Sequence, residues 1–400
     1  MKKALLALTL CFMTVFAMVA CEEVTTTAAT TGAATTGAVT TTTAAVTTTT
    51  VDDVYQIAMV TDSGGIDDKS FNQGTYEGIV EYATAHNKTY KYYKPAEVSD
   101  AAYLAAIGLA VEGGAEIVIT PGFLFESSIY SAQTLYPNVK FVLIDGEPHT
   151  PDYSTYNTAS NTLCILFDEQ EAGFFAGYAA VIGGMENLGF FGGMAVPAVV
   201  RFGIGFVAGA YYAAEELGNV NAITFDASHY YYLGSFAPSD EAKTRAASWF
   251  SAGVDILFAA AGGAGSSAMA AAEEAEGKWT IGVDKDQADD SLTVITSALK
   301  GVGEAAISAL TDFYEGTFVG GRTISLGAAE GGVGLPADFS RFGTSATAVS
   351  TAYNALFILV VAGTVVAPTN DGSSLAAFLT ALGVTPAQVT AICNAAEPIA

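Results

Sequence analysis

The feature that most constrains the fold is a regular alternation of short apolar runs with longer helical patterns, beginning near residue 55. Short runs rich in β-branched and aromatic residues are typical of buried strands, and the helical patterns between them are long enough to form crossovers of a parallel sheet. The first series predicts strands at 55–61, 89–93, 116–120 and 140–144 and helices at 74–86, 99–112 and 125–135. The pattern therefore predicts an α/β protein.

The alternation stops over residues 146–161, an irregular stretch that holds two prolines, and then begins again. The second series predicts strands at 162–167, 188–191, 222–225, 255–259, 280–283 and 293–297. Its helices are expected at 169–182, after Pro197, and at 241–251, 301–314, 346–361 and 374–382. Two series in one chain predict two doubly wound lobes with parallel sheets.

The break between the two series sets the expected lobe boundary. We expect the first lobe to cover residues 51–160, together with a return segment at about 293–330. The second lobe is expected to cover residues 161–292 and part of 331–400. In open parallel sheets, ligands sit at the carboxyl ends of the strands, so two facing sheets predict a ligand cleft between the lobes.

The N-terminus has the pattern of an export signal. Two lysines precede an apolar run, residues 4–19, that is too short for a membrane-spanning helix. The residues Met-Val-Ala-Cys at 18–21 resemble the bacterial lipobox, whose cysteine receives diacylglycerol and becomes the first mature residue. We therefore expect residues 1–20 to be a lipoprotein signal peptide and Cys21 to be a lipid anchor. An ordinary thiol after a plain signal peptide is the alternative.

A linker follows this predicted anchor. Residues 24–50 consist only of Thr, Ala, Val and Gly, so this stretch has neither charge nor aromatic side chains with which to build a core. We expect residues 21–50 to be a disordered tether that separates the folded domain from the membrane. No other segment is predicted to span a membrane.

Charge and metal-ligand content exclude some classes of partner. Lys and Arg number 15 against 41 Asp and Glu, a formal net charge of −26, which repels nucleic acid. The three histidines stand singly, so we expect no metal site and no cofactor. Beyond the signal and Cys21, only Cys164 and Cys393 remain, and a disulfide between them is left open.

The most informative motif lies directly after the first predicted strand. Residues 61–73 read Thr-Asp-Ser-Gly-Gly-Ile-Asp-Asp-Lys-Ser-Phe-Asn-Gln. The run Asp-Asp-Lys-Ser-Phe-Asn resembles the hallmark of the basic membrane protein family, the purine-nucleoside-receptor-type lipoproteins of ABC importers. Further segments that resemble the family, in the family's order, lie at 141–145, 170–177, 201–206, 234–236, 281–287 and 296–300. The resemblance covers about Tyr55 to Lys300 and is less distinct after about Leu335.

The resemblance implies both a fold and a function. The fold would be the periplasmic-binding-protein type I fold, with a ligand cleft between its lobes. The function would be that of a lipid-anchored solute-binding protein on the extracytoplasmic face of the cell membrane, binding a nucleoside, with a purine nucleoside expected. The partners would be the permease and ATPase subunits of an ABC importer. We expect a monomer without enzymatic activity.

In the family, two phenylalanines, one from each lobe, sandwich the base. The first corresponds to Phe71 of the hallmark motif and the second resembles Phe236, with Phe202 kept as the alternative. Stacking on an aromatic ring contributes about 1–3 kcal/mol per base and tolerates different bases. For Phe71 and Phe236, placement in the core is the competing interpretation.

Polar residues near strand ends complete the expected site. Asp62 ends the first strand and corresponds to the family's base-recognition position, although it could instead cap the following turn. Asn72 can offer both a donor and an acceptor. Asp67 and Asp68 are expected to cap the helix and fix the loop rather than to touch the ligand.

Three charged residues and one glycine are expected at the sugar. Asp145 and Asp284 each end a predicted strand, where carboxylates can hold vicinal hydroxyls from opposite lobes, as the resemblance also implies. Lys300 would donate to the ribose or pair with Asp284, unless it is a surface lysine. Gly262 would let the backbone approach the sugar closely. Lys285 is expected to point to the opposite side from Asp284.

Two other functions have to be weighed. Residues 61–68 also resemble the calcium-binding aspartate motif of nucleoside hydrolases, but the further aspartate needed two residues before Asp62 is replaced by Val60, which cannot bind a hard cation. No Ser-His-Asp or Cys-His grouping is evident either. A surface lipoprotein with an adhesive or structural role would keep the fold without binding a ligand.

Overall fold

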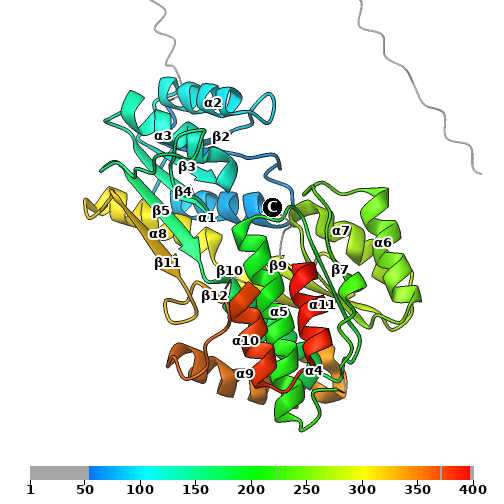
Figure 1. Ribbon diagram of the computed structural model, residues 1–400. Helices are drawn as coiled ribbons and strands as arrows, with labels where there is room; N and C mark the ends of the chain where they lie inside the picture. Colours follow the sequence, from blue (N-terminus) through cyan, green and yellow to red (C-terminus); the bar gives the residue numbers. More distant parts are fainter. Residues whose placement is uncertain (1–53, 222, 370–371, 397–400) are drawn as a thin grey trace, which may run out of the picture. The chain divides into compact units, whose positions relative to one another are not determined.

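The computed structural model describes residues 54–221, 223–369 and 372–396, which contain two six-stranded sheets (Figure 1). The predicted signal peptide, Cys21 and the linker lie outside the described residues. The predicted α/β fold with two parallel sheets is confirmed.

The first sheet has six parallel strands in the order β11-β5-β4-β3-β1-β2. The strands are β1 (Ile57–Val60), β2 (Tyr90–Tyr93), β3 (Ile117–Pro121), β4 (Lys140–Ile144), β5 (Thr162–Phe167) and β11 (Arg322–Leu326). Every residue of β1 and β3 is buried, whereas the edge strands β2 and β11 are partly exposed. Burial on both faces explains why the central strands read as continuous apolar runs.

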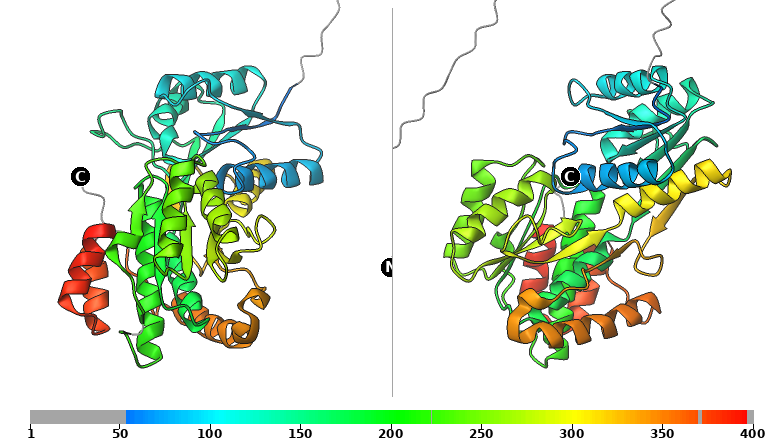
Figure 2. Two further views of the ribbon diagram at one scale, coloured as in Figure 1. Left: turned by 90° about the vertical axis from the view of Figure 1, so that its right-hand side faces the viewer. Right: turned by 180° about the vertical axis from the view of Figure 1, so that it is seen from behind.

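Helices cover both faces of the first sheet. One face carries α1 (Phe71–Ala85) and α8 (Val302–Glu315), which lie side by side in Figure 2, and the other carries α2 (Asp100–Glu112) and α3 (Glu126–Leu135). Ile79 of α1 packs in one core cluster with Ile57 and Ile119 of the sheet. The alternate strand residues, such as Val118, face α2 and α3.

The second sheet has the order β12-β10-β9-β8-β6-β7. Its strands are β6 (Leu188–Gly192), β7 (Tyr230–Tyr232), β8 (Ile256–Ala260), β9 (Trp279–Asp284), β10 (Val294–Lys300) and β12 (Val333–Gly334). All neighbours are parallel except β12, which runs antiparallel to β10. In both sheets the first five strands along the chain are arranged 2-1-3-4-5, so the two lobes repeat one doubly wound topology.

The second sheet is also covered on both faces. Helices α4 (Glu169–Ile182) and α5 (Pro197–Glu216) pack on one face, and α6 (Asp240–Ser251) and α7 (Gly265–Glu273) pack on the other. The C-terminal helices are α9 (Ala346–Val361), α10 (Gly372–Ala381) and α11 (Pro386–Ala396). They contact α4, α5 and β7, so this segment adds to the second lobe, as expected for part of 331–400.

The predicted lobe boundary at residues 160–161 is wrong by one strand. Residues 162–167 form β5, which pairs with β4 and β11 of the first sheet. The return segment also begins later than predicted, because 293–297 belong to β10 of the second sheet and only α8 and β11 return. A buried strand has the same apolar sequence in either sheet, and the irregular loop at 146–161 does not mark a change of lobe.

A second correction concerns the edge of the second sheet. The strand predicted at 222–225 is not formed; among its described residues, Thr224 makes a single bridge to Asn187. The edge strand is β7, at residues 230–232. Cys164 is a buried free thiol on β5, so the open possibility of a disulfide with Cys393 is not realised in the structure.

Three crossovers connect the two sheets: β5 to α4, β10 to α8, and β11 to β12. Hydrogen bonds join them to one another. The Asp168 N–H donates to Leu326 O at 3.2 Å, and the Gly301 N–H donates to Gly332 O at 2.8 Å. Glu171 accepts the Ala328 N–H at 2.7 Å. These bonds hold the three crossovers together as one connection between the lobes.

Helices α4 and α5 are in backbone contact. A Cβ atom on Gly177 would lie 2.0 Å from Phe206 O, and one on Gly209 would lie 1.9 Å from Phe174 O. No side chain fits at these positions, because real Cβ atoms do not approach other atoms so closely. The glycines therefore let the two helices pack as a single unit against the second sheet.

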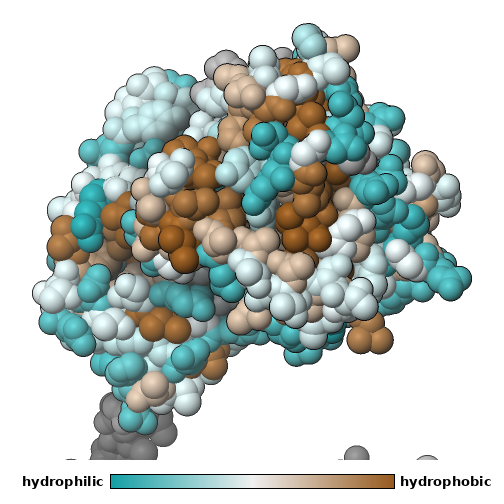
Figure 3. Space-filling model, turned by 90° about the horizontal axis from the view of Figure 1, so that it is seen from below, coloured by the Kyte–Doolittle hydropathy of each residue, from teal (hydrophilic) through white to brown (hydrophobic). Residues whose placement is uncertain are grey.

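Apolar surface remains exposed on α9 and on the segment that follows it. Ile358 and Val366 are 67% and 69% exposed. Figure 3 shows patches of apolar surface on the underside of the molecule in the view of Figure 1. By length and composition, α5 and the segment Ser340–Val361 could cross a membrane. α5 is instead a buried core helix, and Leu356 on α9 packs into the second lobe.

We predict that Gly177→Ala lowers the free energy of unfolding by about 2 kcal/mol, because the added methyl group forces α4 and α5 apart. Gly74→Ala is the matched control: it also lies in a helix, but its Cβ would meet only the end of the Val302 side chain, at 3.1 Å. Its gain in helix propensity keeps the expected change within about 1 kcal/mol. Urea unfolding of both variants measures the difference, and equal losses would contradict this view of the α4–α5 contact.

Candidate functional site

The predicted site residues lie at the carboxyl ends of strands from both sheets. Asp145 follows β4 in the first sheet, whereas Asp284 and Lys300 are the last residues of β9 and β10 in the second. Asp145 and Asp284 have φ angles of +61° and +67°, which non-glycine residues rarely adopt. Such conformations are held only where the surroundings enforce them, and they are common at functional sites.

The loop before α1 is organised by Asp68. Its Oδ1 accepts the backbone N–H groups of Ser70 and Gln73, each at 3.0 Å, and its Oδ2 accepts the N–H of Asn72 at 3.0 Å. These bonds satisfy the free N–H groups at the start of the helix. The prediction that Asp68 caps the helix and fixes the loop is therefore confirmed.

The Asn72 amide orients Asp62. Its Nδ2 donates to Asp62 Oδ1 at 2.8 Å and to Asp68 Oδ2 at 2.9 Å, while its Oδ1 accepts the Asp62 N–H at 3.3 Å. The Gly64 N–H also donates to Asp62 Oδ1, at 2.8 Å. Burial raises the pKa of Asp62 despite these donors. The side-chain amide of Asn72 thus makes its hydrogen bonds within the loop, and its expected contact with a ligand stays a prediction.

Lys300 is the centre of the charged part of the site. Its side chain is 2% exposed, and its ammonium donates to Asp145 Oδ2 and lies 3.0 Å from Glu169 Oε1. Its Nζ also lies 4.8 Å from the ring centre of Phe71. The interpretation of Lys300 as a surface lysine is therefore wrong, because the side chain is buried between the two lobes' strand ends.

The charges in this cluster shift one another's pKa values. Burial raises the pKa of Asp145 to about 6, although Lys300 acts to lower it. Burial would lower the pKa of Lys300, but Asp145, Glu169 and Asp284 raise it above its usual value. Burial likewise acts to raise the pKa of Glu169, but Lys300 and Arg201 outweigh it and keep that pKa low. At neutral pH the cluster is therefore a network of ionised groups.

Within the described residues, two carboxylate oxygens of this network lack a hydrogen bond: Asp145 Oδ1, and Glu169 Oε1, which lies 3.0 Å from Lys300 Nζ without forming one. Asp145 Oδ1 is buried, and within the described residues it has no donor, whereas Oδ2 of the same carboxylate accepts from Lys300. An unsatisfied buried acceptor costs about 1–3 kcal/mol. A hydroxyl group that reached Asp145 Oδ1 would remove that penalty.

Glu169 and Arg201 complete the network, and sequence reasoning missed both. Glu169 is fully buried, and its Oε2 accepts from Arg201 Nε at 2.6 Å. A usable signal existed, because Glu169 lies two residues after the predicted strand 162–167, close to where ligand-site residues are expected. It was hidden because that strand, residues 162–167, was assigned to the wrong lobe.

The loop of the first lobe also contacts β9 and the turn after it. The Ser70 hydroxyl donates to Asp284 Oδ2 at 2.5 Å, and the Gln287 side-chain amide donates to Lys69 O at 2.7 Å. Lys285 pairs with Glu77 of α1 at 2.8 Å and so points away from Asp284, as expected. Burial raises the pKa of Asp284, with Lys300 opposing the shift.

The candidate stacking rings differ in their surroundings. Phe202 is 2% exposed and packs edge-to-face on Phe258 in the core, at 5.8 Å between ring centres. Phe236 is half-buried. Its ring packs closely on Gly193, because a Cβ atom added to that glycine would lie 2.3 Å from the ring. Gly262, with a φ of +54°, lies against the same side chain. Of the two candidates, Phe236 is the more exposed.

The loop after β8 lies near the hallmark loop. A Cβ on Gly263 would lie 3.3 Å from Phe236 O and 3.7 Å from Asp68 O. Phe236 and Gly262 of the second lobe therefore approach the loop that carries Phe71 in the first lobe. The structure brings the predicted residues of both lobes into one region, in which Asp62 is connected to the others through Asn72 and Asp68.

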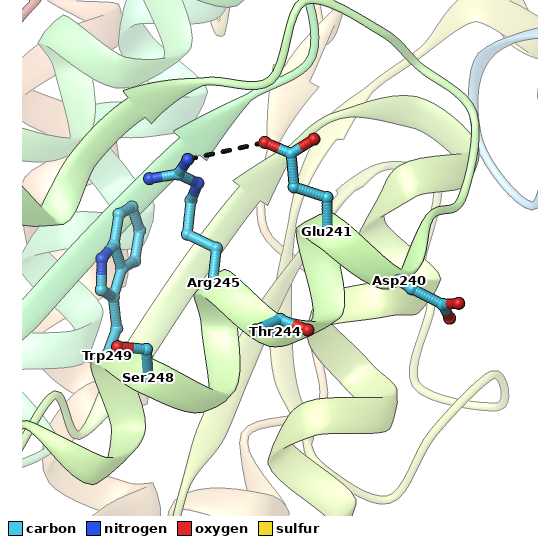
Figure 4. A pocket seen from close by; sticks show the side chains of 6 residues that line it. All are labelled: Asp240, Glu241, Thr244, Arg245, Ser248 and Trp249. Atoms are coloured by element: carbon cyan, nitrogen blue, oxygen red, sulfur yellow. Dashed lines mark ion pairs between the residues drawn. The ribbon is translucent and has the colours of Figure 1, made fainter.

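A separate surface hollow lies on α6 (Figure 4). It is lined by Asp240, Glu241, Thr244, Arg245, Ser248 and Trp249. The Arg245 guanidinium is already engaged, at 3.5 Å from the ring centre of Tyr231 and 3.7 Å from Glu241. None of the predicted site residues lines this hollow. Among the described residues, no group of three or more His, Cys, Asp or Glu side chains could hold a metal ion.

The fold and these strand-end residues define the class of a two-lobed binding protein, and comparison with known proteins gives its family. A family model described as "ABC transporter substrate-binding protein PnrA-like" (Bmp) matches residues 55–352. The chain therefore belongs to the Bmp family of ABC transporter substrate-binding proteins. Members of this class are extracytoplasmic, bind a small solute for a permease and are generally not enzymes.

Individual relatives agree with this assignment. The chain is 31% identical over 303 residues to the CD4+ T-cell-stimulating antigen of Listeria monocytogenes, covering 70% of this chain and 80% of that protein. It is 30% identical to the ABC transporter nucleoside-binding protein BmpA of Lactococcus lactis, covering 70% and 81%. A solute-binding protein of an Aeropyrum pernix ABC transporter system has the same fold, with a TM-score of 0.66 at 24% identity, covering 85% and 99%.

We predict that Lys300→Met destabilises the protein by about 3–5 kcal/mol, because it leaves buried carboxylates without their cation. Lys285→Met is the control, since Lys285 belongs to a partly exposed pair with Glu77 and should contribute less than about 1 kcal/mol. The free energies of unfolding at pH 7.5 give the comparison. Similar values for the two variants would mean that Lys300 does not hold the cluster together.

Proposed function

We propose that the protein binds a nucleoside, with purine nucleosides preferred, and delivers it to the permease of an ABC importer. The observation that carries this proposal is the buried Asp145 Oδ1, an acceptor without a donor beside the ammonium of Lys300. A sugar hydroxyl is a neutral donor of the kind this position lacks. The name of the Lactococcus lactis relative, a nucleoside-binding protein, supports the same ligand class.

The aromatic residues supply the other half of the proposed site. Phe71 and Phe236 come from different lobes and are half-buried, so each keeps a face for a base. Asp62 is held by Asn72 and Gly64 with a raised pKa, and it would accept a ring N–H from the base edge. Asp284 and Lys300 would hold the sugar together with Asp145. Binding would draw the lobes together, and the closed form would dock on the permease.

The proposed membrane attachment depends on the N-terminus. The lipobox-like residues before Cys21 and the uncharged linker support a lipid anchor on the extracytoplasmic face. Such an anchor would keep the binding domain near its permease without a membrane-spanning helix.

The direct test is calorimetric titration with inosine, guanosine, adenosine, cytidine, ribose and AMP, after removal of bound ligand by unfolding and refolding. Saturable heats with nucleosides, but not with ribose or AMP, are expected. The opposing function, a surface lipoprotein with an adhesive or structural role, predicts no heat with any of them.

We predict that Phe236→Ala weakens nucleoside binding by roughly 5- to 150-fold, which corresponds to the loss of about 1–3 kcal/mol of stacking. Phe202→Ala is the contrasting change, because Phe202 is a core residue and its truncation should mainly lower stability. Titration and thermal unfolding of both variants separate the two roles. Loss of binding in Phe202→Ala alone, with its fold intact, would assign the second stacking ring to Phe202.

We predict that nucleoside affinity falls as the pH drops below about 6. Asp145 accepts a hydroxyl in its ionised form, and its raised pKa means that it takes up a proton through this range. The lost acceptor should weaken binding between pH 7 and pH 5. Titrations across this range should show the fall in the native protein and a flatter profile in Asp145→Asn, whereas identical profiles would exclude Asp145 as the titrating group.

A further inference from the structure

Glu169 is a buried charge that no expected ligand contact explains. It is 0% exposed and is the first residue of α4, directly after the crossover from β5. One of its oxygens lies 3.0 Å from Nζ of Lys300, and the other accepts from Arg201 at 2.6 Å. A buried carboxylate is tolerated only when it is paired in this way. Its position at a crossover connects the charged cluster to the link between the lobes.

The backbone fixes Glu169 and Arg201 against each other. A Cβ on Gly205 would lie 2.0 Å from the carbonyl oxygen of Gln170, the residue after Glu169. A Cβ on Gly173 would lie 2.1 Å from the carbonyl oxygen of Phe202, the residue after Arg201. The two helices are therefore in backbone contact next to the ion pair on both sides, and Glu169 has little room to move away from Lys300.

The charges around Lys300 leave no cation available to an anionic ligand. The carboxylates of Asp145, Glu169 and Asp284 surround Lys300, and Arg201 is paired with Glu169. The cluster thus holds two cationic side chains and three carboxyl groups. A phosphate needs donors that are not already paired, so this arrangement disfavours it.

We infer that Glu169 is a positioning and specificity-determining residue, which neutralises and orients Lys300 so that the site admits a neutral nucleoside and rejects its phosphate ester. This inference rests on the proposed nucleoside function. Glu169 acts through the ammonium of Lys300, which lies 3.0 Å from its Oε1. Removal of its charge would leave Lys300 with fewer carboxylates around it and Arg201 without its partner, so the site would repel a phosphate less.

The experiment compares inosine with inosine 5′-monophosphate by calorimetric titration at pH 7.5. The native protein is expected to prefer inosine by at least about 100-fold, equivalent to about 2.8 kcal/mol. Glu169→Gln should reduce this preference at least tenfold, and Glu169→Asp, which keeps the charge, should retain most of it. Glu171→Gln is the matched control, because Glu171 lies on the same first turn of α4 but bonds to Ala328 N–H.

The outcomes are distinct. If Glu169→Gln loses affinity for both ligands equally or keeps the native preference, a purely structural role is left and the inference fails. If Glu169→Gln does not fold, Arg201→Gln is measured instead, because it leaves Glu169 paired with Lys300 alone. The preference of this variant for inosine should then equal or exceed that of the native protein. A decrease in that preference would overturn the inference. A native protein that binds neither ligand would overturn the proposed function and this inference with it.

Discussion

The rest of the site depends on the burial of one lysine between carboxylates at the junction of two sheets. Lys300 ends β10 in the second sheet and donates to Asp145 at the end of β4 in the first. An ammonium with 2% exposure is stable only when its donors and charge are matched, so the strand ends of both lobes must come together around it. Asp145 and Asp284, two of the carboxylates that raise the pKa of Lys300, both have positive φ angles.

Close backbone contacts between helices hold the strand ends of both lobes around Lys300. Glycines bring α4 against α5, and a further pair, Gly78 and Gly303, brings α1 against α8. The hydrogen-bonded crossovers then connect the two doubly wound sheets at three places along the chain. A change in the angle between the lobes would therefore bend these crossovers, two of which lie next to Lys300 and Glu169. This arrangement is consistent with a binding protein that closes on its ligand.

The sequence predicted the elements well where the pattern was local. Buried parallel strands such as β3 read as continuous apolar runs, and Ser99 and Ser239 cap α2 and α6 with their side chains. Membership of a sheet was predicted less well, because β5 has the same apolar character whichever lobe it joins. The edge strand β7 was misplaced for a related reason: its three tyrosines, of which only Tyr230 is buried, are less apolar than residues 222–225.

Among the site residues, strand-end position was the reliable signal. It placed Asp145, Asp284 and Lys300 near one another, and the charged pairs between them follow from the folded geometry. It could not show that the Asn72 amide would be used inside its own loop, because that depends on the path of residues 61–72. Nor could it pair Glu169 with Arg201, which are 32 residues apart and meet only through the α4–α5 contact.

The central claim is that one neutral nucleoside is held between residues of both lobes. The most direct test is a crystal structure of the protein grown with inosine. The account predicts the base between the rings of Phe71 and Phe236 and a ribose hydroxyl on Asp145 Oδ1. A bound inosine elsewhere, or a different solute retained in this place, would contradict it.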